Sequence, residues 1–385
     1  MMAASRHLFA MKSRKYAASS DSTHLFPMMI PMTKMRNSGI AIPHKLPSVA
    51  VLEMTCKCNQ TCLFCSCPWY APGFYCSDEL SPERWMQVID SLVSRGVTQI
   101  AFTGGECLLK PGLKEILDFA ASLTVDRIFP GTSDASSQKL VITLLSNGRC
   151  MTEEWLTDIA KHGIQLSMSL PGLDKFDELT GNDTGPDPVL EWFRRAKTYG
   201  IRTNVGITVT NRNLFELYET IAESLIAGAD TILLNRFLPG GRGLQHRDLE
   251  LDAAGIEEML DVAESALRQA GRFGSVGTEL PVCVVGDINR FERLKVSTTC
   301  GAAQGFFVIG ADGGIRTCNH SPVVCGNVDR LDEVTTDPYW RRFAGRDYLP
   351  VSCRTCGDSV RCDGGCREAA HIVAGRIDSS DSVLA

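Results

Sequence analysis

From residue 47 onward, short apolar runs alternate with longer segments whose apolar residues recur at helical spacing. The apolar runs predict strands at residues 49–54, 99–102, 140–145, 164–170, 201–210 and 231–237. Helices are predicted to begin at Ser81 and to span residues 112–122, 152–162, 189–199, 213–227 and 255–270. Such alternation predicts an α/β fold, with a parallel sheet covered by helices. Six units are too few for a complete eight-stranded barrel, so we expect a partial (β/α)6 TIM-type barrel, open on one side.

The pattern changes near residue 300, where the chain becomes rich in Cys, Gly and turn residues. Residues 306–309 and 315–317 flank Asp312-Gly313-Gly314 and predict a β-hairpin. We therefore expect a core domain at 47–245, a helical linker at 246–299 and a small Cys-rich β-hairpin and loop domain at 300–385.

Residues 1–46 have no clear period and contain seven basic residues against one acidic residue, Asp21. This composition favours a flexible basic N-terminal arm. A clamp on an acidic peptide and an organelle transit peptide are the alternatives.

Composition narrows the class of protein. The 385 residues carry a net charge of −6, which gives no reason to expect nucleic acid as a partner. No apolar stretch approaches the ~18 residues that span a bilayer, so we expect no membrane association. No secretory signal is evident. Sixteen cysteines in such a chain indicate a reducing compartment, which we take to be the cytoplasm, and metal ligation.

Three of the cysteines, Cys58, Cys62 and Cys65, follow the first predicted strand with the spacing C-x3-C-x2-C. Three thiolates are one short of filling a tetrahedral zinc site or of capping a cubane of four irons. The set therefore indicates a cluster with one iron left open for a substrate. A zinc site completed by Cys56 or Cys67 is the alternative, and it would leave the glycine-rich loop at residues 104–106 unexplained.

Other polar residues follow the next strands: Gly104, Gly105 and Glu106 after the second, Asn147 after the third, and Ser169 at the end of the fourth. The C-terminal ends of barrel strands carry the chemistry in folds of this kind. Taken singly, these residues are equally typical of tight turns and caps. Because all of them follow the C-terminal ends of predicted strands, we expect them to form one site.

With Phe64 at its aromatic position, the cysteine spacing resembles the signature of the radical S-adenosylmethionine (SAM) enzymes, and residues 47 to about 245 resemble their catalytic domain. The resemblance implies a [4Fe-4S] cluster on the three cysteines, whose open iron is chelated by SAM. One electron would cleave SAM to methionine and a 5′-deoxyadenosyl radical, which abstracts hydrogen from the substrate. Phe64 would lie against the adenine of SAM. Gly104 and Gly105 have no Cβ, so their backbone would approach SAM closely, and Glu106 would accept a hydrogen bond from the SAM ammonium group. Asn147 and Ser169 would bond the ribose or the carboxylate.

The C-terminal region resembles the SPASM extension of enzymes that mature peptides and sulfatases. Its pattern is matched by Cys300, Gly313, Cys318, Cys353, Cys356, Cys362 and Cys366. The resemblance implies two auxiliary [4Fe-4S] clusters, one on Cys300, Cys318 and Cys366 and the other on Cys353, Cys356 and Cys362. A structural zinc ribbon at residues 353–366 is the rival interpretation.

This sequence departs from the family pattern in two places. No cysteine follows Cys366, so the second auxiliary cluster lacks the fourth ligand that the family pattern supplies. Cys325, His371 or another residue could take that place. If none does, the cluster would keep an open iron that could bind substrate directly. Pro171-Gly172 and Thr180-Gly181 stand where many relatives have an Asp-Gly and an Arg that helps to hold SAM. The remaining cysteines, Cys107, Cys150 and Cys283, are interpreted as buried small apolar residues.

The family resemblance implies a radical SAM oxidoreductase that oxidatively modifies or crosslinks side chains of a ribosomally synthesised peptide. A sulfatase-maturing or a cofactor- or heme-biosynthetic enzyme is the first alternative, and a zinc-ribbon binding module on a barrel scaffold is the alternative from another class. The expected partners are the peptide or protein substrate, an electron donor such as flavodoxin or ferredoxin, and a separate leader-recognition protein, because no recognition domain is evident in the chain.

Overall fold

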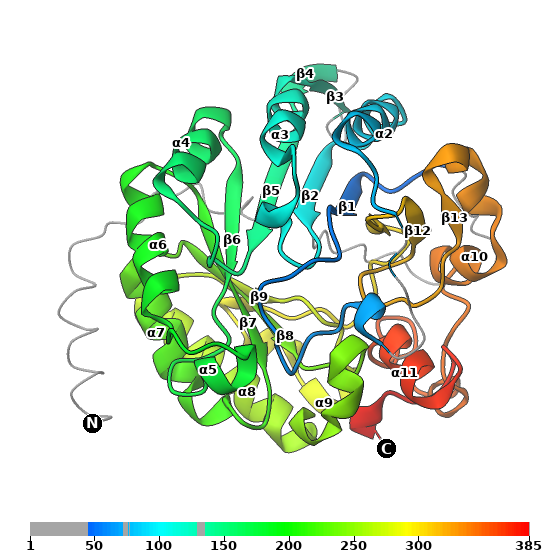
Figure 1. Ribbon diagram of the computed structural model, residues 1–385. Coiled ribbons are helices and arrows are strands. Elements are labelled where there is room, and N and C mark those ends of the chain that lie inside the picture. Colours follow the sequence, from blue (N-terminus) through cyan, green and yellow to red (C-terminus); the bar gives the residue numbers. More distant parts are fainter. Residues whose placement is uncertain (1–44, 72–75, 77, 129–134, 385) are drawn as a thin grey trace.

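The computed structural model describes residues 45–71, 76, 78–128 and 135–384, and structural statements below refer to these residues (Figure 1). The predicted basic arm at 1–46 lies outside them apart from its last two residues, Lys45 and Leu46. Within the described part of the chain, no helix is both long and apolar enough to cross a membrane.

An 11-stranded sheet in the order β10-β9-β8-β7-β6-β5-β2-β1-β11-β12-β13 forms the framework. Pairing is parallel from β10 to β11 and antiparallel from β11 to β13. Its strands are β1 Val49–Glu53, β2 Gln99–Thr103, β5 Val141–Ser146, β6 Gln165–Ser169, β7 Thr203–Val209, β8 Thr231–Arg236, β9 Gly274–Val276, β10 Leu294–Lys295, β11 Phe306–Ile309, β12 Gly314–Arg316 and β13 Gly326–Asn327. The first six of these confirm the partial barrel that the sequence predicts.

Helices alternate with the strands along the chain, and those between the barrel strands, such as α3, α4 and α6, cover the outer face of the curved sheet (Figure 1). They are α2 Pro82–Ser94, α3 Leu113–Ser122, α4 Glu153–His162, α5 Phe176–Thr180, α6 Asp187–Thr198, α7 Leu217–Ala227, α8 Ala253–Ala270, α9 Val282–Val285, α10 Pro338–Ala344 and α11 Arg367–Ala374. Helix α2 begins where the sequence predicts, because the Ser81 side chain accepts a hydrogen bond from the Arg84 N–H and Pro82 needs no partner there.

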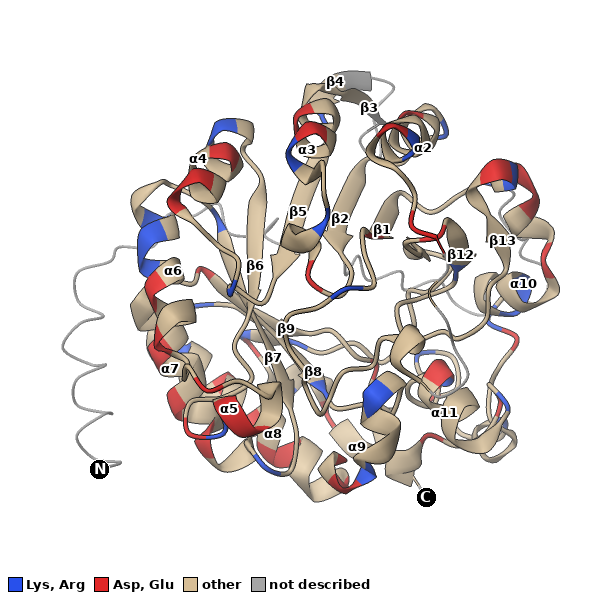
Figure 2. Ribbon diagram, viewed as in Figure 1, with Lys and Arg blue, Asp and Glu red and all other residues tan. Residues whose placement is uncertain are grey.

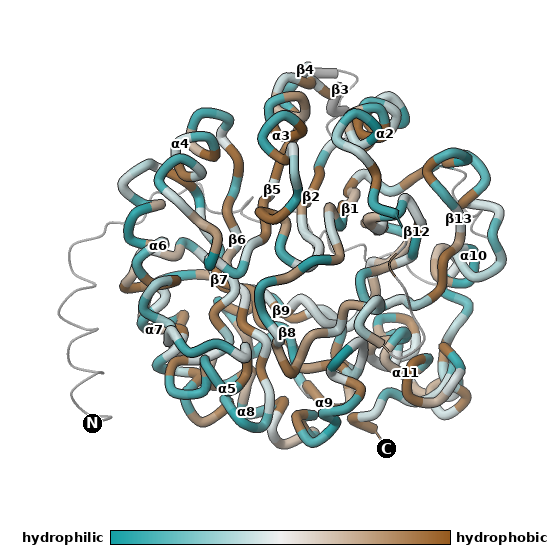
Figure 3. Tube along the Cα trace, in the orientation of Figure 1, coloured by the Kyte–Doolittle hydropathy of each residue, from teal (hydrophilic) through white to brown (hydrophobic). Residues whose placement is uncertain are grey.

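Apolar residues fill the space between sheet and helices, while charged residues lie mainly on the outer helices (Figures 2 and 3). Trp85 of α2 and Phe193 of α6 are fully buried beneath that layer. Val51, Ala101 and Val308 form a separate small cluster on neighbouring strands, and two of them line the central cavity described below. Burial on both faces is typical of parallel strands, and it explains why most residues of these strands are apolar.

Two parts of the domain organisation differ from the sequence prediction. The segment at 246–299 is more than a helical linker, because β9 and β10 extend the sheet beyond β8. These strands have three and two residues, which is too short to show a period. The predicted C-terminal hairpin also joins the sheet, since β11 pairs with β1 and satisfies backbone groups that an open barrel edge would leave exposed.

The sequence prediction also passed over an antiparallel hairpin between α3 and β5. Its strands, β3 Thr124–Ile128 and β4 Ala135–Lys139, form a separate two-stranded sheet. The printed sequence there is mostly polar, without the alternating apolar residues by which a half-buried strand is recognised.

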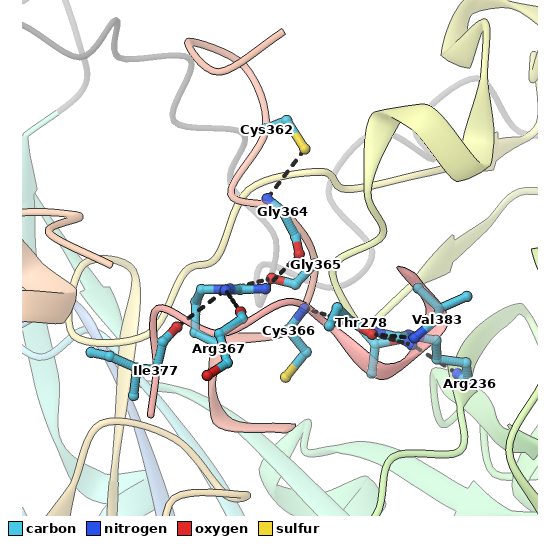
Figure 4. A network of polar contacts seen from close by, with 11 residues as sticks. Arg236, Thr278, Cys362, Gly364, Gly365, Cys366, Arg367, Ile377 and Val383 are labelled. Atoms are coloured by element: carbon cyan, nitrogen blue, oxygen red, sulfur yellow. Dashed lines mark hydrogen bonds and ion pairs between the residues drawn. The ribbon is translucent and has the colours of Figure 1, made fainter. Parts of the chain in front are cut away.

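Two buried ion pairs fasten the C-terminal region to the barrel. Arg316 of β12 pairs with Glu53 of β1, and Arg236 at the end of β8 pairs with Asp381 near the C-terminus. Asp381 also accepts hydrogen bonds from the backbone N–H groups of Cys366 (2.7 Å) and Val383 (3.1 Å) (Figure 4). The C-terminal segment is thereby held against the end of a barrel strand.

Candidate functional site

A cavity of about 770 Å³ lies at the C-terminal ends of the barrel strands. One part of its wall contains Cys58, Cys62 and Cys65, and another contains Cys300, Cys318 and Cys366. The structure therefore brings two of the predicted cysteine sets to one space, although more than 200 residues separate them in sequence.

The loop that carries Cys58, Cys62 and Cys65 is fixed mainly through its backbone. The Thr61 N–H donates to the Thr180 carbonyl at 3.1 Å, and the Leu63 N–H donates to the Leu179 carbonyl at 2.9 Å. The Arg242 guanidinium donates to the Cys62 carbonyl at 3.2 Å and lies over the Tyr70 ring, 4.5 Å from its centroid. Thr180, which replaces the family's usual Arg position, thus helps to hold the cysteine loop.

Gly104 and Gly105 lie against this loop so closely that no side chain fits. A Cβ atom on Gly105 would come within 2.2 Å of the Lys57 carbonyl oxygen, and one on Gly104 within 2.5 Å of the Thr55 carbonyl oxygen. Both glycines line the cavity. The close approach explains why the position after β2 requires glycine.

Replacing Gly105 with alanine is expected to displace the cysteine loop and to weaken SAM binding at least tenfold. The reason is that the new Cβ would clash with backbone atoms of Lys57, which cannot rotate away as a flexible side chain could. Equilibrium binding of SAM to the reconstituted protein measures the effect. Gly206→Ala in β7 is the matched control, because its Cβ would meet only the Met168 carbonyl at an ordinary 3.9 Å. Equal affinities for the two variants would contradict the close-approach argument.

Glu106 does not line the cavity, and the predicted contact between its carboxylate and the SAM ammonium stays a prediction. Its side chain is buried and accepts hydrogen bonds from the Ser146 hydroxyl (2.8 Å) and from the N–H groups of Asn147 (2.7 Å) and Leu108 (3.2 Å). Burial raises the pKa of this carboxyl, and those hydrogen bonds oppose the rise. Glu106 therefore positions the start of the Asn147 loop.

The other predicted SAM-binding residues do line the cavity: Phe64, Asn147 and Ser169. The Asn147 amide donates to the Asn59 side-chain oxygen at 2.7 Å, which ties the β5 loop to the cysteine loop. Phe64 packs against a small buried cluster of Leu179, Phe237 and Leu249. These residues can bind or orient a molecule that sits beside the three cysteines.

The thiols of this loop differ in their acidity. A hydrogen bond with the Cys67 thiol, opposed by burial, lowers the pKa of Cys65 to about 7. Burial raises the pKa of Cys58 and of Cys62. A bound iron would deprotonate such thiols outright, so three convergent thiols beside a glycine cradle fit an iron–sulfur cluster.

Glu279 and the three cysteines of the second wall share a buried environment. Burial raises the pKa of Cys300, Cys318 and Cys366, and Glu279 adds to each rise. Burial also raises the pKa of Glu279 to about 7. The sequence prediction missed Glu279 because a lone acid in an irregular segment carries no signal.

Cys325, the predicted substitute metal ligand, lies apart from the cavity, and its role as a ligand stays a prediction. It does not line the cavity. Its thiol lies beside Asp337, and after burial this carboxylate is the main cause that raises its pKa. His371, the other predicted substitute ligand, has its Nδ1 occupied by the Tyr339 hydroxyl at 2.8 Å and by Glu368 at 3.3 Å.

The distances between candidate ligand atoms are relevant to the two zinc alternatives, one at the loop of Cys58, Cys62 and Cys65 and one at residues 353–366. A tetrahedral zinc site with ~2.3 Å bonds requires sulfurs about 3.8 Å apart. In the described part of the chain, the one group of three candidate ligand atoms within 4.8 Å of one another is Cys56, Cys76 and Glu79, and its two cysteines form a disulfide. Cys56 is therefore not free to complete a zinc site with Cys58, Cys62 and Cys65, and the zinc ribbon at residues 353–366 stays an alternative.

The remaining three cysteines were predicted to be buried, and the structure confirms this for one of them. Cys107 is buried, as predicted, and its thiol lies 2.8 Å from the Leu145 carbonyl. Cys150 is only partly buried, and the Asn59 amide donates to its sulfur at 3.1 Å. Cys283 is exposed, so its prediction as a buried apolar residue is wrong.

Comparison with known proteins identifies the barrel. Residues 52–223 match the model of the radical SAM superfamily. The chain is 23% identical over 351 residues to a PqqA peptide cyclase of Granulibacter bethesdensis, covering 88% of this chain and 87% of that protein. It is 26% identical over 286 residues to the sporulation killing factor maturation protein SkfB of Bacillus subtilis, covering 74% of this chain but 63% of SkfB, which is less than two thirds.

Solved structures share the fold. Streptococcus suis SuiB bound to precursor peptide SuiA superposes with a TM-score of 0.67 at 17% identity, covering 88% of this chain and 76% of SuiB. Native anSMEcpe with bound AdoMet gives a TM-score of 0.63 at 17% identity, covering 88% of this chain and 92% of that chain. At these identities the likeness establishes the fold alone.

Proposed function

Because this chain carries a radical SAM domain at residues 52–223, we propose that it reductively cleaves SAM and oxidatively modifies or crosslinks side chains of a ribosomally synthesised peptide. The observation that carries the proposal is the cavity of about 770 Å³ with one cysteine set on each of two walls. A cavity of this size lies near the upper end of the ~300–1,000 Å³ typical of ligand sites, so it leaves room for a substrate side chain beside SAM.

Each part of the first wall has a role in this proposal. Cys58, Cys62 and Cys65 would hold a [4Fe-4S] cluster, which when bound supplies the electron that cleaves SAM to a hydrogen-abstracting radical. The backbone at Gly104 and Gly105 would bind one end of SAM, and Asn147 and Ser169 would orient the rest. Apolar residues on the strands beneath would keep water away from the reacting atoms.

The peptide substrate is inferred by analogy with the relatives named above. PqqA peptide cyclase and the killing factor maturation protein are named for peptide modification, and SuiB has been solved with a precursor peptide bound. The product we favour is a thioether or a carbon–carbon crosslink. Fold likeness alone does not assign a substrate, so the chemistry of the site has to be tested directly.

The proposal extends to the C-terminal region and to partners. We assign residues 300–385 to a SPASM region with one auxiliary [4Fe-4S] cluster on Cys300, Cys318 and Cys366 and another on Cys353, Cys356 and Cys362. A flavodoxin or ferredoxin would deliver electrons, and a separate protein would recognise the peptide leader. Tight binding of a precursor leader by the isolated enzyme would exclude the need for that recognition protein.

The test uses anaerobically reconstituted protein with SAM, dithionite and a displayed library of cysteine-containing peptides. We expect peptides to raise 5′-deoxyadenosine formation at least tenfold over the peptide-free rate, and selected peptides to lose two hydrogen atoms per crosslink by mass spectrometry. Reactions with S-adenosylhomocysteine in place of SAM are the control. Deuterium on the modified side chain should appear in 5′-deoxyadenosine, because the radical abstracts that atom.

Other outcomes separate the alternatives. A peptide aldehyde that reacts with hydrazide would indicate sulfatase-type maturation instead of crosslinking. If no peptide raises 5′-deoxyadenosine formation, and a small metabolite does, the peptide proposal is wrong and a cofactor-biosynthetic role replaces it.

A further inference from the structure

Cys283 of helix α9 lies beside the loop that carries Cys353, Cys356 and Cys362. The backbone N–H of Val282, the residue before Cys283, donates to the Cys362 sulfur at 3.4 Å. This contact joins α9 to a loop almost 80 residues further along the chain. The start of α9 and the second auxiliary cysteine set therefore meet at the same place.

The loop wraps its own cysteines around one point. The Gly364 N–H donates to the Cys362 sulfur at 3.3 Å, and a Cβ on Gly364 would lie 3.3 Å from the Cys353 sulfur. The Cys356 N–H donates to the Cys353 carbonyl at 3.2 Å, which closes the turn between these two residues.

Exposure of the thiols agrees with this geometry. Cys283 and Cys356 are both exposed, whereas Cys362, whose sulfur accepts from the Val282 N–H, is buried. The start of α9 therefore places Cys283 at the exposed side of the cysteine loop.

Other candidates for a fourth ligand are engaged elsewhere. Cys325 lies beside Asp337, and His371 is held by Tyr339 and Glu368. Asp358, within the loop itself, pairs with Arg361 at 2.7 Å.

We propose that Cys283 is the fourth ligand of the second auxiliary cluster. This inference rests on the proposed function, which assigns a cluster to Cys353, Cys356 and Cys362. Binding transfers no electron: an iron–sulfur bond forms and the Cys283 thiol releases its proton to solvent. With four thiolates the cluster has no open iron for substrate, and its exposed side is accessible to an external electron carrier.

Alkylation of the unmutated protein tests the proposal without any risk of misfolding. Iodoacetamide should label Cys283 and Cys356 in the cluster-free protein, and anaerobic reconstitution should lower the labelling of both at least tenfold, as read by peptide mass spectrometry. If Cys356 is protected and Cys283 is labelled as before, the fourth-ligand proposal is overturned while the auxiliary cluster stands. If neither is protected, the auxiliary cluster itself is absent, and both proposals for this loop fail.

Variants give a second readout that does not depend on activity. In a Cys58/Cys62/Cys65→Ala background, which retains only auxiliary clusters, Cys283→Ala should lose between about one and four of about eight irons and change the Mössbauer spectrum. Cys325→Ala in the same background is the matched control and should keep its iron. Equal iron contents and spectra in the two variants would overturn the assignment of Cys283.

Discussion

Replacing Cys58, Cys62 and Cys65 together with alanine is expected to remove about four irons from the reconstituted protein and to abolish SAM cleavage. The three thiols line the central cavity and share one loop. Iron and sulfide analysis with Mössbauer spectra measures the loss, and 5′-deoxyadenosine formation measures the activity.

The iron content of the parent protein makes this result quantitative. A fall from about twelve irons to about eight would indicate three cubane clusters, and a fall from about eight to about four would indicate that one auxiliary site is empty. Cys150→Ala is the control, because this thiol contacts Asn59 but belongs to neither cysteine set. Zinc without iron in the parent would refute the radical mechanism and restore the zinc-ribbon alternative.

Replacing Asp381 with alanine is expected to destabilise the protein by about 3–5 kcal/mol, since it leaves the Arg236 charge buried and unpaired. Both side chains are almost completely buried, at 3% and 0% exposure. The change also removes acceptors for the Cys366 and Val383 amides. Chemical denaturation gives the free energy of unfolding, and hydrogen exchange should show lost protection in residues 366–384.

An exposed ion pair provides the control for Asp381. Asp332 pairs with Arg95 at 2.9 Å, but its side chain is 81% exposed, so Asp332→Ala should leave the free energy of unfolding almost unchanged. If the two variants lose equal stability, the buried pair does not anchor the C-terminal segment. Unchanged hydrogen exchange at residues 366–384 in Asp381→Ala would lead to the same conclusion.

The sequence by itself determined the features that depend on residues close together in the chain. Six strand–helix units were predictable because burial on both faces makes each strand an apolar run, and α2 could be placed from Ser81 and Pro82. The loop of Cys58, Cys62 and Cys65 was predictable because its spacing is local. The positions of Asn147 and Ser169 followed from the rule that the ends of parallel strands meet at one edge.

Only the tertiary structure decided which distant segments meet and where their side chains point. β11 closes against β1 because unpaired backbone groups of the first strand need partners, and no local pattern names them. Glu106 turns inward because three hydrogen-bond donors of the neighbouring loops converge on its carboxylate. Helix α9 meets the 353–366 loop through the Val282 N–H and the Cys362 sulfur, although 80 residues separate them in sequence. Spacing along the chain sets local geometry, whereas ligand sets formed by distant residues depend on how the whole chain packs.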